Sequence, residues 1–228
     1  GSPLLSADYS GDLNFNASPL EVKSSAATPA YTTISTFTYD PTSLVVGQMT
    51  TINIVVSVNE PGSGTPDGDV VISNGVDQCV VTLVDGAGTC EFVPTVTGSP
   101  LLTATYAGSE NYNGYYREIP GPSVIPADTS IESVTFDPES LVVGQPTSLS
   151  VTVVVDLPGS GVPTGTVLIS NGTDSCEVTL VDGSGTCEFV PTAPGQPDLL
   201  ATYSGDSKFN GSEGTFGGPV VSKAFVTP

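Results

Sequence analysis

Apolar and polar residues alternate over short stretches of this chain, and turn-forming residues separate the stretches. Ser148–Asp156 alternates at its start and is rich in Val and Thr, which is typical of a strand with one buried face. Ile131–Phe136 and Gly165–Ser170 have the same character, and they are followed by the strand-ending pair Asp137-Pro138 and the tight-turn pair Asn171-Gly172. No stretch carries apolar residues at helical spacing, so the pattern predicts an all-β protein.

The next two stretches predict a hairpin that carries two cysteines. Cys176 and Val178 share one parity before a turn at Asp182–Gly185, and Cys187 and Phe189 share one parity after it. Side chains at alternate positions of a strand lie on the same face. Both cysteines are therefore expected to lie against the core.

Two further stretches complete about seven predicted strands. They cover Leu199–Tyr203 and a final segment from about Gly218 to Phe225. Short strands separated by turns roughly every 8–12 residues are typical of a Greek-key sandwich. The chain has no Trp, so it lacks the Cys–Trp–Cys core of antibody domains. We predict an immunoglobulin-like (Ig-like) sandwich with a local disulfide.

The sequence repeats with a period of 97 residues. CVVTLVDGAGTCEFVP at 79–94 recurs as CEVTLVDGSGTCEFVP at 176–191, and 176 − 79 = 97. The register holds back to Gly1–Leu5, which matches Gly98–Leu102. The repetition predicts tandem sandwiches, joined through a semi-rigid proline-containing linker at Gly121–Pro126. The predicted parts are the last strands of an incomplete unit at 1–32, a complete unit at 33–129 (repeat 1) and a complete unit at 130–228 (repeat 2).

The chain is strongly acidic, with 24 Asp and Glu against 4 Lys and Arg and a net charge of −20. Such a charge repels nucleic acid, which binds Lys and Arg through its phosphates, and it disfavours an anionic membrane surface. No apolar run approaches the ~18 residues of a membrane span. We therefore predict no nucleic-acid partner and no membrane insertion, and we interpret the acidity as the solubility of an extracellular surface.

The composition also argues against an enzyme. The chain has no His, which excludes Ser–His–Asp and Cys–His catalytic groups. A pair of carboxylates could support glycoside hydrolysis, but the acidic residues that recur between repeats lie at turns, where Asp commonly caps a loop. We predict no catalytic residue and no cofactor.

Calcium is the one metal that the acidic residues bring into question. Hard cations bind oxygen ligands from loops, yet no Asp-rich calcium-binding loop is present. Solvated turn residues and a strand stop are the favoured interpretation, with calcium as the alternative. The weak candidate ligands, each of which has a counterpart in repeat 1, are Asp137, Asp174, Asp182 and Glu188.

The four cysteines predict disulfides and an extracellular location. Three pairings are formally possible. Pairing Cys79 with Cys90 and Cys176 with Cys187 is preferred, because only this pairing lets each repeat fold alone. Such bridges persist in an oxidising exterior. Two thiolates per repeat without His cannot complete a zinc site.

Tyr112, Tyr115 and Tyr116 cluster in repeat 1 and form a candidate patch for a sugar or protein partner, since Tyr is enriched at interfaces. Repeat 2 has only Phe209 at this place. The patch is a hypothesis that rests on composition alone.

Repeat 2 carries three ordered motifs: PTGTV at Pro163–Val167, VDGSGT at Val181–Thr186 and ATYSGDSKF at Ala201–Phe209. Together they resemble the tandem bacterial Ig-like repeats of surface proteins and adhesins. The resemblance implies an Ig-like sandwich that serves as a spacer in stalks or fibres, and it offers no catalytic or ligand motif. The paired cysteines depart from the usual pattern of the family and suggest additional stabilisation.

We therefore expect a structural module of a bacterial cell-surface stalk or filament, with neighbouring repeats or copies of the chain as partners. One alternative is an adhesin repeat that binds a surface glycan or a host protein. The other is a self-assembling fibre subunit, in which residues 1–32 add strands to the sheet of another molecule.

Overall fold

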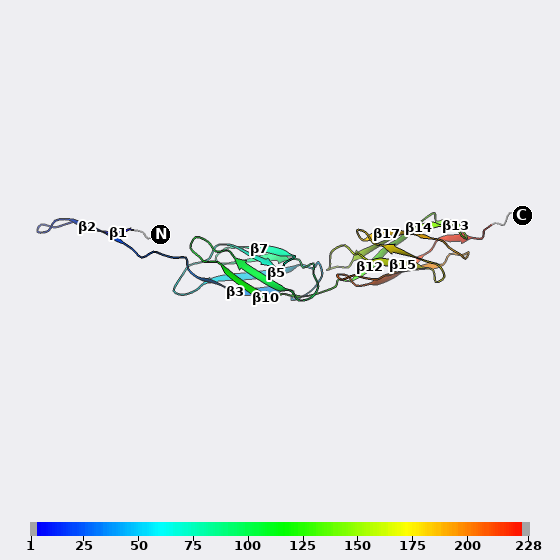
Figure 1. Ribbon diagram of the computed structural model, residues 1–228, viewed down its shortest axis with the longest axis horizontal. Helices are drawn as coiled ribbons and strands as arrows, with labels where there is room; N and C mark the ends of the chain where they lie inside the picture. The colour runs from blue at the N-terminus through cyan, green and yellow to red at the C-terminus, as the bar shows by residue number, and fades with distance from the viewer. Residues whose placement is uncertain (1–3, 225–228) are drawn as a thin grey trace.

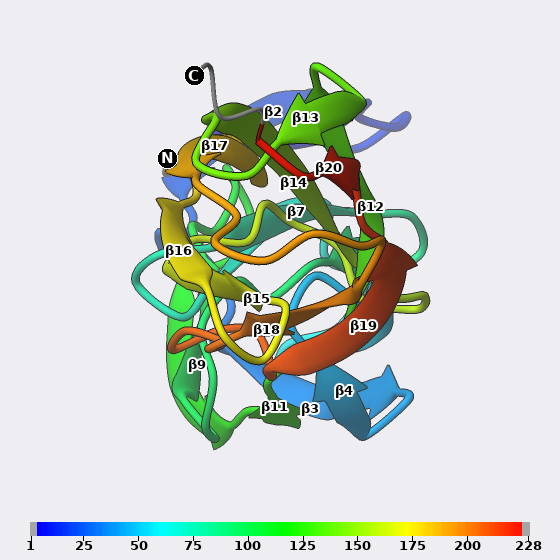
Figure 2. The same ribbon diagram turned by 90° about the vertical axis from the view of Figure 1, so that its right-hand side faces the viewer.

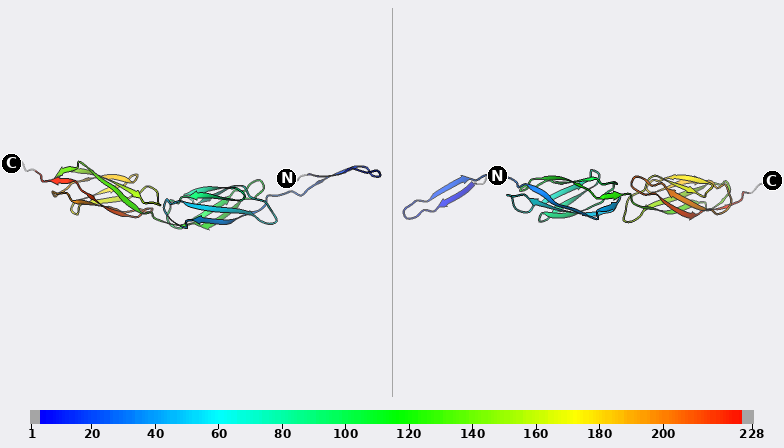
Figure 3. Two further views of the ribbon diagram at one scale, coloured as in Figure 1. Left: turned by 180° about the vertical axis from the view of Figure 1, so that it is seen from behind. Right: turned by 90° about the horizontal axis from the view of Figure 1, so that it is seen from below.

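The computed structural model describes residues 4–224, and these residues form strands joined by turns and loops (Figure 1). Two β-sandwiches lie end to end along the long axis, and a separate hairpin lies beyond the first of them (Figure 3). Within this range no helix is long and apolar enough to cross a membrane. The prediction of an all-β fold with tandem sandwiches is confirmed.

Repeat 1 folds as two antiparallel sheets that enclose one core. Its three-stranded sheet contains, in spatial order, β3 (Thr32–Asp40), β5 (Thr50–Val58) and β8 (Ala87–Phe92). Its four-stranded sheet contains β10 (Tyr115–Pro120), β9 (Leu101–Tyr106), β6 (Gly68–Ser73) and β7 (Gln78–Leu83). Alternate residues point inward, so Ile52, Ile54 and Ile72 are buried between the sheets.

Repeat 2 has the same arrangement, seen along the long axis in Figure 2. Its three-stranded sheet contains β12 (Thr129–Asp137), β14 (Thr147–Val155) and β17 (Ser184–Phe189). Its four-stranded sheet contains β16 (Ser175–Thr179), β15 (Thr166–Ser170), β18 (Asp198–Tyr203) and β19 (Ser212–Gly217). Leu149, Ile169 and Phe189 fill the space between the sheets. The strand predicted for Ser148–Asp156 is β14, shifted by one residue.

Two short parallel pairs add to the main sheets, and the sequence pattern did not predict them. They join β4 (Ser43–Val45) to β11 (Ser123–Ile125) and β13 (Ser140–Val142) to β20 (Val220–Ser222). The predicted linker therefore contains a paired strand. The final strand predicted from Gly218 reduces to β20, and its expected end at Phe225 lies outside the described residues. Strands of three residues are too short to show alternation.

The predicted hairpin that carries the two cysteines of each repeat is wrong, because its two strands do not pair with each other. β7 and β8 follow each other in the chain but belong to different sheets, as β16 and β17 do. In repeat 1 only Val84 and Ala87 pair, across a turn in which Asp85 and Gly86 have φ of 53° and 78°. Positive φ at both central residues defines a type I′ turn. Beyond it the strands separate, because β7 pairs with β6 and β8 pairs with β5.

The N-terminal hairpin pairs β1 (Leu4–Tyr9) with β2 (Ser18–Lys23), and every residue in both strands is exposed. At a spacing of 97 residues its strands correspond to β9 and β10, which pack inside repeat 1. Its assignment to an incomplete unit at 1–32 stays a prediction, as do the boundaries of the two repeats.

Candidate functional site

Each repeat contains one disulfide that joins its two sheets. Cys79 bonds to Cys90 and Cys176 bonds to Cys187, each with a Cα–Cα distance of 6.0 Å. The bridges follow from the topology, because β7 and β8 lie in opposite sheets and so do β16 and β17. The sulfurs pack, half-buried, against the cores, as the parity of the sequence predicted. The bridges therefore hold the sheets of each sandwich together at one edge.

A hydrogen-bond cluster, part-buried in repeat 1 and more exposed in repeat 2, fixes the loop that precedes the first cysteine of each repeat. In repeat 1 the Asp77 carboxylate accepts hydrogen bonds from the backbone N–H of Thr95 (2.8 Å), the hydroxyl of Thr95 (2.8 Å) and the side-chain amide of Asn74 (3.0 Å). Burial alone would raise the pKa of Asp77, but these hydrogen bonds together lower it. The cluster ties the β6–β7 loop to the segment after β8.

Repeat 2 has the same cluster around Asp174. Its carboxylate accepts hydrogen bonds from the backbone N–H (2.9 Å) and the hydroxyl (2.7 Å) of Thr192. The Thr192 backbone hydrogen bond, followed by the Thr192 hydroxyl, lowers the pKa of Asp174. The oxygens of this calcium candidate are therefore already engaged by protein donors.

We expect this cluster to make stability depend on pH. A pKa that is lowered in the folded state stabilises the fold fully above the unfolded pKa of about 3.9, and this stabilisation is lost as the pH falls through the folded pKa. The free energy of unfolding of repeat 2 should therefore decrease below about pH 4. Denaturant titrations across pH should show a shallower loss for Asp174→Asn, whereas the exposed Asp198→Asn should follow the parent chain.

The structure does not bring the four calcium candidates together. Asp137 ends β12, Asp182 lies in the β16–β17 turn with φ of 52°, and Glu188 lies in β17 opposite Ser148. From residue 4 to residue 224 no group of three or more His, Cys, Asp or Glu is arranged to hold a metal ion.

We expect chelation to leave the melting temperature unchanged. The reason is that Asp174 is satisfied by Thr192 and the other three candidates lie apart. Differential scanning calorimetry with EDTA and with added calcium measures this. A melting temperature that EDTA lowers and calcium restores would support the calcium hypothesis instead.

The three tyrosines do not share one exposed face. Tyr112 and Tyr115 are half-buried and pack against the core of repeat 1. Tyr116 is 56 % exposed and donates a hydrogen bond of 2.8 Å to Glu118 Oε1, which raises the pKa of Tyr116. Only Tyr116 offers a largely free ring, and its role in binding a partner stays a prediction.

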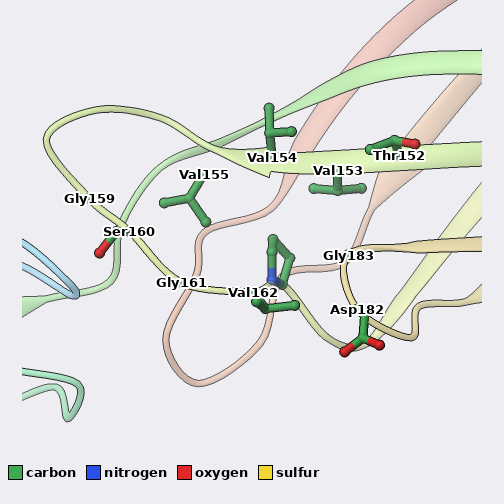
Figure 4. A pocket seen from close by; sticks show the side chains of 11 residues that line it. Thr152, Val153, Val154, Val155, Gly159, Ser160, Gly161, Val162, Asp182 and Gly183 are labelled. Carbon is green, nitrogen blue, oxygen red and sulfur yellow. The ribbon is translucent and has the colours of Figure 1, made fainter.

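A groove open to solvent lies in repeat 2 beside the end of β14 (Figure 4). The loop from Gly159 to Pro163 and the turn at Asp182 form its other walls. Its lining is mainly Val side chains and backbone, and Asp182 is the one charged residue in it. This groove supplies neither a pair of carboxylates nor a nucleophile with a base, so it does not assemble catalytic groups.

The contact between the two repeats is the feature that the sequence analysis missed. Residues 45–48 of repeat 1, the tip loop, touch residues 159–161 of repeat 2, the GSG loop. The backbone N–H of Ser160 donates to the carbonyl of Val46 (3.2 Å), and its hydroxyl donates to the carbonyl of Gly47 (2.8 Å). In Figure 4 the Ser160 hydroxyl points away from the groove, toward repeat 1.

The contact requires glycine at position 47, and apolar residues of repeat 1 beside it join the core of repeat 2. Gly47 has φ of 77°, and an added Cβ would overlap the backbone of Ser160. Leu44, Val46 and Val124 of repeat 1 belong to the same apolar cluster as the core of repeat 2. The motif VVGQ recurs in both repeats, but nothing in its sequence shows what it touches. The two sandwiches are therefore packed against each other as well as linked.

The family comparison agrees with this architecture. Residues 134–217 match the model of the bacterial Ig-like domain (group 3). This match covers most of repeat 2. Repeat 1 has the same strand order and an equivalent disulfide, so the resemblance that the motifs carry extends to its fold.

Several solved structures are similar to the chain at low sequence identity. The adhesin InvE of Yersinia pseudotuberculosis is 15 % identical with a TM-score of 0.40, and the match covers 81 % of this chain and 58 % of InvE. The Escherichia coli adhesin FdeC is 15 % identical with a TM-score of 0.32, covering 91 % and 69 %. The titin fragment A168–A169 is 12 % identical with a TM-score of 0.41, covering 85 % and 99 %. No curated protein sequence matches the chain.

Proposed function

We propose that this chain is a structural module of a bacterial cell-surface stalk or filament, located outside the cell and without catalytic activity. The observation that carries the proposal is the end-to-end arrangement of the two sandwiches (Figure 3), which are packed against each other where Gly47 meets Ser160. Such a contact holds neighbouring sandwiches in line. Ig-like adhesins among the similar structures are compatible with a surface location.

The covalent and electrostatic features support the same role. Each sandwich has its two sheets joined by a disulfide, which suits an oxidising exterior. The net charge of −20 favours solubility, and only 4 Lys and Arg offer sites to trypsin-like proteases. These features favour a durable, soluble spacer.

Small-angle X-ray scattering together with glycan-array binding tests the proposal. A spacer should scatter as an elongated particle with both repeats in line, and it should bind no glycan specifically. Saturable binding of a glycan that Tyr116→Ala removes, with Tyr31→Ala as the control for an exposed tyrosine just before repeat 1, would favour the adhesin and overturn the spacer. A compact scattering profile would also overturn it.

A second candidate function, self-assembly through residues 1–32, rests on the exposed hairpin. Leu5 and Tyr9 are 60 % and 47 % exposed, whereas their equivalents in repeat 1, Leu102 and Tyr106, are 0 % and 1 % exposed. A two-stranded hairpin alone is marginally stable in water, so a partner that covers its apolar face would stabilise it. Deletion of residues 1–32 should then abolish any polymer seen by electron microscopy, and unchanged polymers would exclude this candidate.

A further inference from the structure

The contact between the repeats has two halves, a tip loop and a GSG loop. A second copy of each lies at an outer end of the pair of sandwiches, one at each end. Gly47 corresponds to Gly144 in repeat 2, since 47 + 97 = 144, and Ser160 corresponds to Ser63 in repeat 1, since 160 − 97 = 63. The tip loop of repeat 2 is therefore residues 142–145, and the GSG loop of repeat 1 is residues 62–64.

The tip loop of repeat 2 has the backbone conformation of the loop that is already in contact. Gly144 has φ of 82° against 77° for Gly47. The three hydrogen bonds that shape the loop in repeat 1 run from Val46 N to Ile125 O (2.9 Å), Gly47 N to Pro94 O (2.9 Å) and Gln48 N to Val45 O (3.1 Å). Those in repeat 2 run from Val143 N to Ser222 O, Gly144 N to Pro191 O and Gln145 N to Val142 O, each 2.9 Å long. The loop is thus formed without a neighbour on it.

The tip loop of repeat 2 is less covered than the tip loop of repeat 1. Val46 is buried with 2 % of its surface exposed, whereas Val143 is half-buried and Gly144 is exposed. An added Cβ at Gly47 would overlap Ser160, but one at Gly144 would meet no atom within 4 Å. The tip loop of repeat 2 therefore presents the shape and the carbonyl groups of the contact uncovered.

The GSG loop of repeat 1 is the matching half. Gly62 packs closely on Ala30, as Gly159 packs on Ala127 in repeat 2. Gly159 and Ala127 are buried, whereas Gly62 and Ala30 are only half-buried. Both loops thus have the same internal support, and the loop of repeat 1 lacks the cover that the contact gives to the loop of repeat 2.

We infer that the tip loop of repeat 2 is an interaction surface for the GSG loop of repeat 1 in a second copy of this chain, so that molecules associate end to end. The inference rests on the proposed structural function, to which it adds a contact between molecules. The contact inside the chain is its template: Ser63 takes the place of Ser160 and donates to the carbonyl groups of Val143 and Gly144.

The expected affinity follows from the contact inside the chain. A short linker gives its two ends an effective concentration of about millimolar, so a contact that forms across it has a dissociation constant of about that order or lower. Separate molecules should therefore associate with a Kd of about 1 mM or below. Nuclear magnetic resonance measures binding in this range.

The experiment titrates ¹⁵N-labelled chain with unlabelled chain. Amide shifts should move in a saturable way at Gly144, Gln145 and Ser63, and should stay constant at Gly47 and Ser160. Gly144→Asn should abolish the shifts, because Asn tolerates positive φ while its side chain occupies the surface. Ser63→Arg should abolish them from the other side.

A mixture of the two variants separates lost contact from lost folding. Gly144→Asn molecules keep an intact GSG loop and Ser63→Arg molecules keep an intact tip loop, so mixing them should restore the shifts at Gly144 of the Ser63→Arg chain. Shifts that remain absent up to several times the expected Kd of about 1 mM, fail to return on mixing, or appear instead on the β1–β2 hairpin would overturn the inference. Scattering from dilute chain tests the spacer separately, since an elongated monomer that never associates would leave the spacer standing and remove only this contact.

Discussion

Replacing Cys176 and Cys187 together by Ala should lower the free energy of unfolding of repeat 2 by about 3 kcal/mol. The bridge closes a loop with a sequence separation of 11 residues and joins the two sheets of the sandwich. In the chain-entropy model a loop of this size restricts the unfolded state by about that amount. Calorimetry of the whole chain measures the change, because repeat 1 keeps its bridge and acts as an internal reference.

The corresponding change in repeat 1, Cys79→Ala with Cys90→Ala, is the matched control and should lower the other transition instead. Reduction of the parent chain with dithiothreitol should reproduce the loss in both repeats. If mass spectrometry shows complete reduction while both transitions stay in place, the bridges do not stabilise the sandwiches.

Phe189→Ala should destabilise repeat 2 more strongly, by about 3–5 kcal/mol. Phe189 is 1 % exposed and is among the largest fully buried side chains of the core. Truncation to Ala removes its apolar surface from the core and leaves a cavity that tightly packed strands fill only in part. The transition of repeat 2 should move down by at least about 12 °C in calorimetry, at roughly 4 °C or more per kcal/mol for a domain of this size.

The neighbouring residue provides the control. Val190 is 40 % exposed, so Val190→Ala should change the free energy of unfolding by less than about 0.5 kcal/mol. Equal losses from the two substitutions would mean that the side chain of Phe189 is not part of a close-packed core. The equivalent Phe92→Ala should act on repeat 1 alone.

The main strands could be predicted because they are long enough to show which face is buried. In β14, Leu149, Val151 and Val153 point inward and are separated by Ser150 and Thr152, so period-two alternation is visible in the sequence. The bridges could be predicted because each repeat contains two cysteines, separated by 11 positions, that can pair without a second repeat. Each of these features is decided by residues close together in the chain.

The features that could not be predicted depend on residues far apart in the sequence. β11 pairs with β4, about eighty positions earlier, and three residues carry no alternation that would reveal it. A turn such as Asp85-Gly86 predicts a hairpin, but the sheet that each strand joins depends on β6 and β5. Likewise, the contact of Gly47 with Ser160 spans 113 positions and has no local pattern.

The parallel pairs have a mechanical consequence. β4 lies near the start of repeat 1 and β11 at its end, with Ser43, Leu44 and Val45 beside Ser123, Val124 and Ile125. Tension applied through the chain pulls the two strands in opposite directions along their length. The ladder between them is then loaded in shear, so its hydrogen bonds must break together instead of one after another. β13 and β20 form the equivalent parallel pair in repeat 2, so a pulling force loads one such pair in shear in each sandwich.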